Sequence, residues 1–209
     1  VVVLGGGVVG SSAIRVALGM GADVTVLDRS VSRLGELDEQ YRGQLRTVYS
    51  TAEALEMHAR EADLIIGAVL IPGASAPKLV TAEMLADFKP GTVMVDVAID
   101  QGGCFETSRP TTHADPTYEV DGVVHYCVAN MPGAVARTAT MALTNATLPY
   151  IIRLASNEVG ALLLEDKHFG AGLNIVHGQL THRAVAEALG QMWTEPDQIL
   201  RASLHLKSA

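Results

Sequence analysis

The sequence has little of several features that define other classes of protein. Only two of its 209 residues are cysteine, Cys104 and Cys127, and it contains no CxxC or His-x-His spacing. We therefore expect neither a disulfide framework nor a metal site. Aromatic residues make up 4% and charged residues 18%, whereas hydrophobic residues make up 48%. This composition excludes a disordered chain and is sufficient for a sizeable core.

Positive charge and long apolar runs are also scarce. Lys and Arg number 15 against 23 Asp and Glu, a net charge of −8, which argues against a surface for nucleic acid or anionic membranes. The sequence has no uninterrupted apolar run of membrane-spanning length and no basic segment ahead of an apolar one. We therefore expect neither a membrane span nor a signal peptide. Together with the few cysteines, these absences predict a cytoplasmic location.

An initiating methionine is absent as well, and Val1 already lies inside an apolar run of strand length. This start predicts that the sequence is a piece of a longer polypeptide. Its 209 residues suffice for one large domain, or for one domain with a substantial appendage.

A motif occupies the first residues of the chain. The apolar run Val1–Leu4 leads into the glycine-rich segment Gly5–Gly10, and a second run, Asp23–Asp28, ends on an acid 18 residues after Gly10. A strand, a glycine turn, a helix and a second strand that ends on an acid are typical of a dinucleotide-binding βαβ unit.

The glycines of such a turn have separate roles. Gly5 lets the chain leave the strand sharply, Gly7 lacks the Cβ atom that would keep the backbone from a pyrophosphate, and Gly10 lets the helix approach the strand. The pyrophosphate is expected against the N–H groups of the first helical turn, at Val8 and Val9, where the helix dipole favours negative charge.

Asp28 predicts which dinucleotide binds. Its carboxylate can accept hydrogen bonds from both ribose hydroxyls of the adenosine and would repel a 2′-phosphate, so we expect NAD and not NADP. Arg29, the next residue, favours the opposite choice, because a cation beside the ribose accommodates a 2′-phosphate.

Apolar runs of strand length alternate with segments of helical period as far as about Asp100. This pattern predicts an α/β fold with a Rossmann-type, doubly wound parallel sheet covered on both faces. The predicted strands are Val1–Leu4, Asp23–Asp28, Leu45–Tyr49, Asp63–Val69, Thr92–Val97 and Gly122–Cys127. The predicted helices are Val8–Met20, Ser30–Arg42, Thr51–Glu61 and Thr81–Phe88. Ser50 begins a capping box and is expected to cap the third helix.

The rest of the chain is less regular. Gln101–Asp121 holds glycines and prolines with little periodicity and is predicted to be a functional loop. Ala134–Ala155 predicts a helix interrupted near Pro149. We expect no second sheet beyond it, only the following short elements: helices at Glu158–Asp166 and Thr181–Leu189 and an apolar run at Leu173–Val176. The predicted domains are an NAD-binding domain at residues 1–133 and a helical C-terminal segment at 134–209.

Three segments should meet in the crevice beyond the carboxyl ends of the strands, where open α/β sheets bind ligands. They are Val69–Gly73, Val97–Gly103 and Val128–Pro132. Asp100 follows an apolar strand, so we expect a partly buried carboxylate that exchanges protons with a substrate or with water. The alternative is that it only caps the glycine turn. Asn130 is expected to hold the nicotinamide carboxamide or a substrate carbonyl, or else to be a turn residue.

Longer runs in the same region carry a family resemblance. They are Asp96-Val97-Ala98-Ile99-Asp100-Gln101-Gly102-Gly103-Cys104-Phe105-Glu106, Ser108-Arg109-Pro110-Thr111-Thr112 and Tyr126-Cys127-Val128-Ala129-Asn130-Met131-Pro132. Together these runs resemble the bacterial L-alanine dehydrogenase family, with a likeness that extends from the first residue to about Pro196. The resemblance implies NAD-dependent, reversible oxidative deamination of L-alanine to pyruvate and ammonium. It also implies a homo-oligomer, expected to be a hexamer.

The resemblance assigns roles to individual residues. Asp100 would be the catalytic acid or base, Asn130 a substrate contact, and Arg33 and Ser50 contacts to the adenine end of the cofactor. The full set of predicted cofactor contacts is Gly5, Gly7, Val8, Val9, Gly10, Asp28, Arg33, Ser50, Val69, Leu70, Val97, Ala98, Ile99, Asp100, Val128, Ala129, Asn130 and Met131.

The sequence departs from the family in one respect. The family's substrate-anchoring Arg and Lys and its catalytic His belong to an N-terminal domain that has no counterpart here, and the segment 134–209 is expected to pack on that domain. We therefore predict that this chain binds NAD but turns over alanine poorly or not at all. Two alternatives stay open: the NAD(H)-binding module of a proton-translocating transhydrogenase, which should lack the run around Asp100, and a non-enzymatic NAD sensor.

Overall fold

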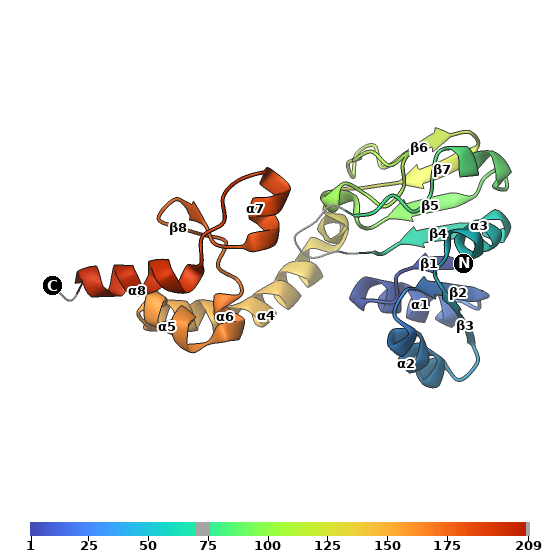
Figure 1. The fold of residues 1–209 in the computed structure, drawn as a ribbon. Helices are drawn as coiled ribbons and strands as arrows, with labels where there is room; N and C mark the ends of the chain where they lie inside the picture. The colour runs from blue at the N-terminus through green and yellow to red at the C-terminus, as the bar shows by residue number, and fades with distance from the viewer. Residues whose placement is uncertain (70–75, 208–209) are drawn as a thin grey trace. The chain divides into compact units, whose positions relative to one another are not determined.

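The computed structural model describes residues 1–69 and 76–207 and divides into two compact units, Val1–Ala134 and Val135–Ala209 (Figure 1). The predicted contact Leu70 lies outside the described residues.

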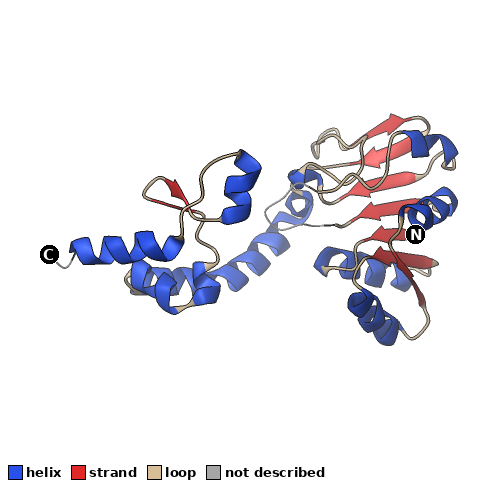
Figure 2. Ribbon diagram, in the orientation of Figure 1, coloured by secondary structure: helices blue, strands red, loops and turns tan. Residues whose placement is uncertain are grey.

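The first unit contains a seven-stranded sheet with the strand order β3-β2-β1-β4-β5-β7-β6, whose strands lie side by side in Figure 2. The strands are β1 (Val2–Leu4), β2 (Val24–Asp28), β3 (Leu45–Tyr49), β4 (Leu64–Gly67), β5 (Val93–Asp96), β6 (Thr117–Val120) and β7 (Val123–Tyr126). Neighbouring strands are parallel except β6 and β7. The predicted fold class, a Rossmann-type α/β fold, is confirmed.

Strand β6 corrects the prediction that residues 101–121 form a loop. It pairs antiparallel with β7, at the edge of the sheet. Pro116 precedes it, and its residues alternate between exposed and half-buried, with Glu119 exposed. An edge strand with one solvated face carries a weaker apolar signal than a central parallel strand. The available signal was Asp121-Gly122, a hairpin turn with positive φ at both residues that joins β6 to β7.

Helices pack on both faces of the sheet. The buried side chains of β1 point alternately to the two faces, so each face needs a covering layer. Val3 belongs to a core cluster with Ile14 of α1 (Val8–Gly19) and Leu37 of α2 (Val31–Tyr41). Val2 and Leu4 point to the opposite face and join a second cluster, which includes Leu55 and Ala59 of α3 (Ala52–Glu61). Successive side chains of a strand point to opposite faces, so three residues of β1 anchor both layers.

Two local predictions in this unit were wrong. The helix expected at Thr81–Phe88 is a short 3₁₀ helix, η1 (Glu83–Asp87), because Val80 pairs with Phe105 and the Ala82 N–H donates to Glu106, which hold the start of the segment outside a helix. The residue that caps α3 is Thr51, whose Oγ1 accepts from the Ala54 N–H at 3.1 Å. Ser50 instead donates its backbone N–H to the Asp28 carbonyl oxygen, which extends the pairing of β2 with β3.

The second unit is mainly helical. Its elements are α4 (Ala136–Ser156), α5 (Val159–Glu165), α6 (Lys167–Gly170), β8 (Ile175–Val176), β9 (Gln179–Leu180), α7 (Arg183–Leu189) and α8 (Pro196–Lys207). The predicted interruption near Pro149 is wrong, because α4 runs through this residue. Proline removes one hydrogen bond from a helix but permits helical φ, so neighbouring turns can continue it.

The second unit also contains a small sheet that the sequence analysis missed. Strands β8 and β9 pair antiparallel across His177 and Gly178, which both have positive φ. Positive φ at both central residues defines a type I′ hairpin turn, for which a glycine at the second position is favourable. Among the described residues, no helix is long and apolar enough to cross a membrane.

Candidate functional site

The candidate site lies where the strand order reverses, at the carboxyl ends of β1 and β4. From β1 the chain continues to β2 on one side, and from β4 it continues to β5 on the other side. The two connections therefore diverge and leave a crevice between them. A cleft of about 510 Å³ occupies this position, lined by Gly5, Gly7, Val8, Val9, Asp28, Arg29, Ser50, Ala68, Val69, Pro77 and Leu79. Many of the residues predicted to contact the cofactor thus meet around one space.

A smaller cleft of about 160 Å³ adjoins the first. Val9, Ala68 and Val69 line both clefts, and the smaller one is completed by Val97, Ala98, Asp100 and Gln101. Asp28 therefore lines the larger cleft, and Asp100 lines the smaller cleft that continues it. Such an elongated site suits a dinucleotide, whose two ends need different surroundings.

The glycine turn has the geometry expected of a phosphate-binding turn. Gly5 has a φ of +95°, and a Cβ atom on Gly10 would lie 1.8 Å from the Gly5 carbonyl oxygen. A Cβ atom on Gly7 would meet nothing within 4 Å, so its backbone faces open space in the larger cleft. Helix α1 begins there without a side-chain cap and without an acid in its first turn. Its first N–H groups are thus available to an anion.

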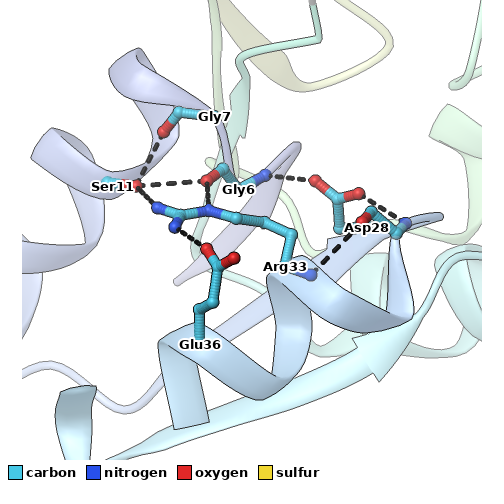
Figure 3. Close-up of polar contacts among 7 residues, drawn as sticks. Gly6, Gly7, Ser11, Asp28, Arg33 and Glu36 are labelled. Carbon is cyan, nitrogen blue, oxygen red and sulfur yellow. Dashed lines mark hydrogen bonds and ion pairs between the residues drawn. The ribbon is translucent and has the colours of Figure 1, made fainter. Parts of the chain in front are cut away.

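Arg33 holds this turn together (Figure 3). It is not among the residues that line the larger cleft. Its Nε donates to the Gly6 carbonyl oxygen at 2.7 Å, and its Nη2 donates to Ser11 Oγ at 2.8 Å. Glu36 pairs with the other end of the guanidinium. The role of Arg33 as an adenine contact stays a prediction, and the structure gives this side chain a place beneath the turn.

Asp28 joins the glycine turn to the end of β2. Its Oδ2 accepts from the Gly6 N–H at 2.7 Å and its Oδ1 from the Ser30 N–H at 2.8 Å. A carboxylate offers roughly four acceptor positions, so the half-buried Asp28 retains capacity for two ribose hydroxyls. The residues at this end of the cleft therefore fit the adenosine of a dinucleotide.

Asp100 lies in η2 (Ile99–Gln101), the short 3₁₀ helix that follows β5. It lines the smaller cleft, but it is exposed, so the expectation of a partly buried carboxylate was wrong. Within the described residues its carboxylate has no hydrogen-bond partner, which does not support the alternative role as a turn cap. Ile99 beside it is buried and packs away from solvent.

The third predicted segment lies outside the residues that line the two clefts. Val128 is fully buried and Ala129 donates its N–H to the Thr111 carbonyl oxygen. Asn130 is exposed with a φ of +57°, and its carbonyl oxygen lies 3.0 Å from His113 Nε2. These features favour a turn for Asn130, and its contact with a ligand stays a prediction, as does that of Met131 in η3 (Met131–Val135).

Sequence reasoning missed three residues around Asp100. Asp96, the last residue of β5, is fully buried and accepts several hydrogen bonds. Lys78 donates to three backbone carbonyl groups in the segment 102–105, which follows Asp100. Gln101 lines the smaller cleft, and its Oε1 is buried without a hydrogen-bond partner in the described parts of the chain. An acid inside an apolar strand was the available signal for Asp96, because a buried charge requires partners.

Other reactive side chains of the first unit have structural surroundings. Burial, followed by the charge of Asp96, raises the pKa of the Cys104 thiol, which is therefore a poor nucleophile. Burial lowers the pKa of His125, which lies 2.7 Å from Thr107 Oγ1 and stacks on Tyr118. The described ranges contain no group of three His, Cys, Asp or Glu side chains that could hold a metal ion.

The fold and the cleft together define a Rossmann-type dinucleotide-binding domain. Residues 1–183 match the family model described as alanine dehydrogenase/PNT, C-terminal domain, and the chain belongs to this family. Membership implies a nicotinamide cofactor. The resemblance to L-alanine dehydrogenase is confirmed.

Individual relatives agree with this family. The chain is 66% identical over 200 residues to an alanine dehydrogenase of Halomonas elongata, covering 96% of this chain and 54% of that protein. A solved structure of an L-alanine dehydrogenase is 49% identical, with a TM-score of 0.81, over 90% of this chain and 52% of the other. A transhydrogenase structure from Sinorhizobium meliloti is 34% identical, with a TM-score of 0.59, over 67% of this chain and 40% of the other. The chain spans about half the length of the curated relatives it matches.

Proposed function

We propose that this chain is the NAD-binding part of an L-alanine dehydrogenase, which converts L-alanine, water and NAD⁺ to pyruvate, ammonium, NADH and a proton. The observation that supports the proposal is the junction of the two clefts, since Asp100 lines the smaller cleft and the glycine turn lines the larger one. The 66% identity to an alanine dehydrogenase supports the choice of reaction and substrate.

The preference for NAD over NADP is part of this proposal. Asp28 would accept hydrogen bonds from the adenosine ribose, and its negative charge would oppose a 2′-phosphate. Arg29 lines the same cleft, but Asp28 is held in place by the Gly6 and Ser30 N–H groups. A fixed carboxylate at the ribose should therefore dominate over an exposed, unfixed cation.

The chain's own residues would bind the cofactor and manage protons. The N–H groups of Val8 and Val9 would bind the pyrophosphate, and Val69, Val97 and Ala98 would enclose the nicotinamide end. NAD, when bound, supplies the hydride acceptor for the alanine Cα atom. Asp100 would pair with the substrate ammonium group and accept a proton from the water that adds to the oxidised carbon.

A substrate-anchoring segment outside this chain is also proposed, because the relatives are nearly twice as long as the part matched here. The second unit, Val135–Ala209, would pack on that segment. The assembly would be a cytoplasmic homohexamer. In this account the chain alone binds NAD without catalysing the reaction at a useful rate.

The test is NADH formation from L-alanine and NAD, measured by absorbance, with the full-length protein that carries this chain. We expect alanine-dependent NADH from the full-length protein. From the isolated chain we expect NAD binding alone. Hydride transfer between two nucleotides without any response to alanine would instead establish the transhydrogenase alternative. Tight NAD binding with no reduced product in either assay would establish the sensor alternative.

A further inference from the structure

A buried carboxylate, that of Asp96, holds together the two ends of the loop that carries Asp100, residues 97–103. Asp96 is 0% exposed. Its Oδ2 accepts from the Cys104 N–H at 2.9 Å and from Ser108 Oγ at 2.5 Å, while its Oδ1 accepts from the Ala98 N–H at 3.1 Å. Hydrogen-bond donors from the start of the loop and from the residues that follow it thus converge on one side chain. Buried carboxylates are stable only when hydrogen-bonded in this way.

The glycine that ends the loop is fitted to this carboxylate. Gly102 and Gly103 have φ values of +89° and +73° and turn the chain back from Asp100 toward Asp96. A Cβ atom on Gly103 would lie 2.7 Å from Asp96 Oδ2 and 2.9 Å from Ser108 Cβ. The path of the loop is therefore determined by close contact with Asp96 as well as by hydrogen bonds.

Lys78 fastens the same loop from a different segment. Its Nζ donates to the carbonyl oxygens of Gly102 at 2.5 Å, Gly103 at 2.9 Å and Phe105 at 3.0 Å. These three bonds use all the donors of the ammonium group. Backbone bonds from Ala76 to Gln101 and from Leu79 to Cys104 lie alongside. The loop is thus held at its base by Asp96 and along its return by Lys78.

We propose that Asp96 and Lys78 are positioning residues for Asp100, which preset its carboxylate for proton transfer. Asp100 itself has no side-chain partner among the described residues, so the backbone beneath it sets its position. Neither Asp96 nor Lys78 is among the residues that line the smaller cleft, so both act through the loop and not on the substrate. This inference rests on the proposed function. It adds to that function the residues that orient the acid or base.

The first test is Asp96→Asn in the full-length protein. Asparagine keeps the shape of the side chain but removes the negative charge that several N–H and O–H donors share. We expect kcat for alanine oxidation to fall about 10- to 100-fold, because a displacement of about 1 Å in a reacting group can cost that much. The Kd for NADH, whose adenosine and pyrophosphate lie at the other end of the site, should change less than about threefold.

A double variant separates positioning from general damage. If Asp96 acts through Asp100, then Asp96→Asn should lower kcat by less than about threefold when Asp100 is already Asn. Losses that multiply in the double variant would overturn the proposal, because they would show two independent effects. An unchanged kcat in the single Asp96→Asn variant would overturn it as well.

Lys78→Met keeps the proposal testable if Asp96→Asn does not fold. Lys78 is exposed, so its replacement leaves the core intact. The matched control is Lys89→Met, since Lys89 also donates to a backbone carbonyl, that of Glu61, before the first residue of β4 and away from both clefts. We expect a lower kcat for Lys78→Met only. Equal effects of the two variants, or none for either, would overturn the role of Lys78.

Amide hydrogen exchange separates this inference from the proposed function. In the isolated chain, Lys78→Met should speed exchange at Cys104 and Phe105, whose N–H groups bond to Asp96, and should leave β1 unchanged. Faster exchange in this variant, together with a full-length wild type that does not oxidise alanine, would refute the proposed reaction while the loop anchor stands. Unchanged exchange beside full alanine activity would refute the anchor alone.

Discussion

Arg33 Nε donates a 2.7 Å hydrogen bond to the carbonyl oxygen of Gly6, 27 residues earlier in the chain. Ser11 Oγ lies between the same guanidinium and the same carbonyl oxygen, so the turn is held from two helices (Figure 3). The backbone N–H of Gly6 itself donates to the carboxylate of Asp28. The glycine turn is therefore held in place by side chains of the chain itself.

Arg33→Met should weaken NADH binding about 3- to 10-fold, because the turn loses a charge-assisted hydrogen bond and becomes mobile. Exposed Arg15 of α1 supplies the matched control, Arg15→Met. Isothermal titration gives the affinities, and amide exchange at Gly7 without cofactor gives the mechanism. Weaker binding with unchanged exchange would mean that Arg33 contacts the adenine directly, as the family resemblance implies.

Asp28→Asn should raise the Kd for NADH by about tenfold and lower that for NADPH. The amide keeps an acceptor for the Gly6 N–H but removes the charge that opposes a 2′-phosphate. Fluorescence titration with both reduced nucleotides measures the two constants. Exposed Asp38 provides the control Asp38→Asn, which removes the same charge from α2. A parallel change in both constants would contradict the assigned role.

Gly10→Ala should destabilise the first unit by about 3 kcal/mol or more, because the new Cβ atom would meet a backbone carbonyl that cannot move freely. The clash is with the Gly5 carbonyl oxygen, at 1.8 Å. Gly19→Ala in the same helix is the control, since a Cβ atom there meets nothing within 4 Å, and helix propensity predicts about 0.5–1 kcal/mol of stabilisation. Urea unfolding measures both. Equal stabilities would show that the helix does not approach the strand as closely as described.

The stability of the first unit should fall as the pH drops below about 6.5, the usual pKa of an unfolded histidine. Burial lowers the pKa of His125 in the folded state. As the pH falls, the unfolded chain therefore binds a proton at this residue before the folded chain does, which lowers the free energy of unfolding. The contribution is complete above pH 6.5 and is lost toward the folded pKa. Urea unfolding across this range should show a steeper loss in wild type than in His125→Gln, with exposed His168→Gln as control.

The sequence predicted the glycine turn and Asp28 well because their requirements are local. Gly5 needs a positive φ and Gly10 needs a close approach, and neither depends on residues far along the chain. The acid at the end of β2 is placed by the length of the βαβ unit alone. For these residues, spacing and backbone geometry contain nearly all of the information.

The surroundings of Asp100 were not predictable in the same way. The partners of Asp96 come from Ala98, Cys104 and Ser108, and no sequence pattern states that their donors converge. The exposure of Asp100 depends on the turn that these bonds create. Convergence of this kind requires coordinates. Strand β6, in contrast, had a local signal, because Asp121-Gly122 joins it to β7 in a hairpin turn with positive φ at both residues.

We infer that Asp100 would carry out proton transfer beside a bound NAD. The most direct measurement compares wild type with Asp100→Asn in the full-length protein, using alanine-dependent NADH formation and NADH affinity on the same samples. We expect a kcat at least about 100-fold lower for the variant, with a Kd for NADH within about threefold of wild type. Full activity in Asp100→Asn would contradict it.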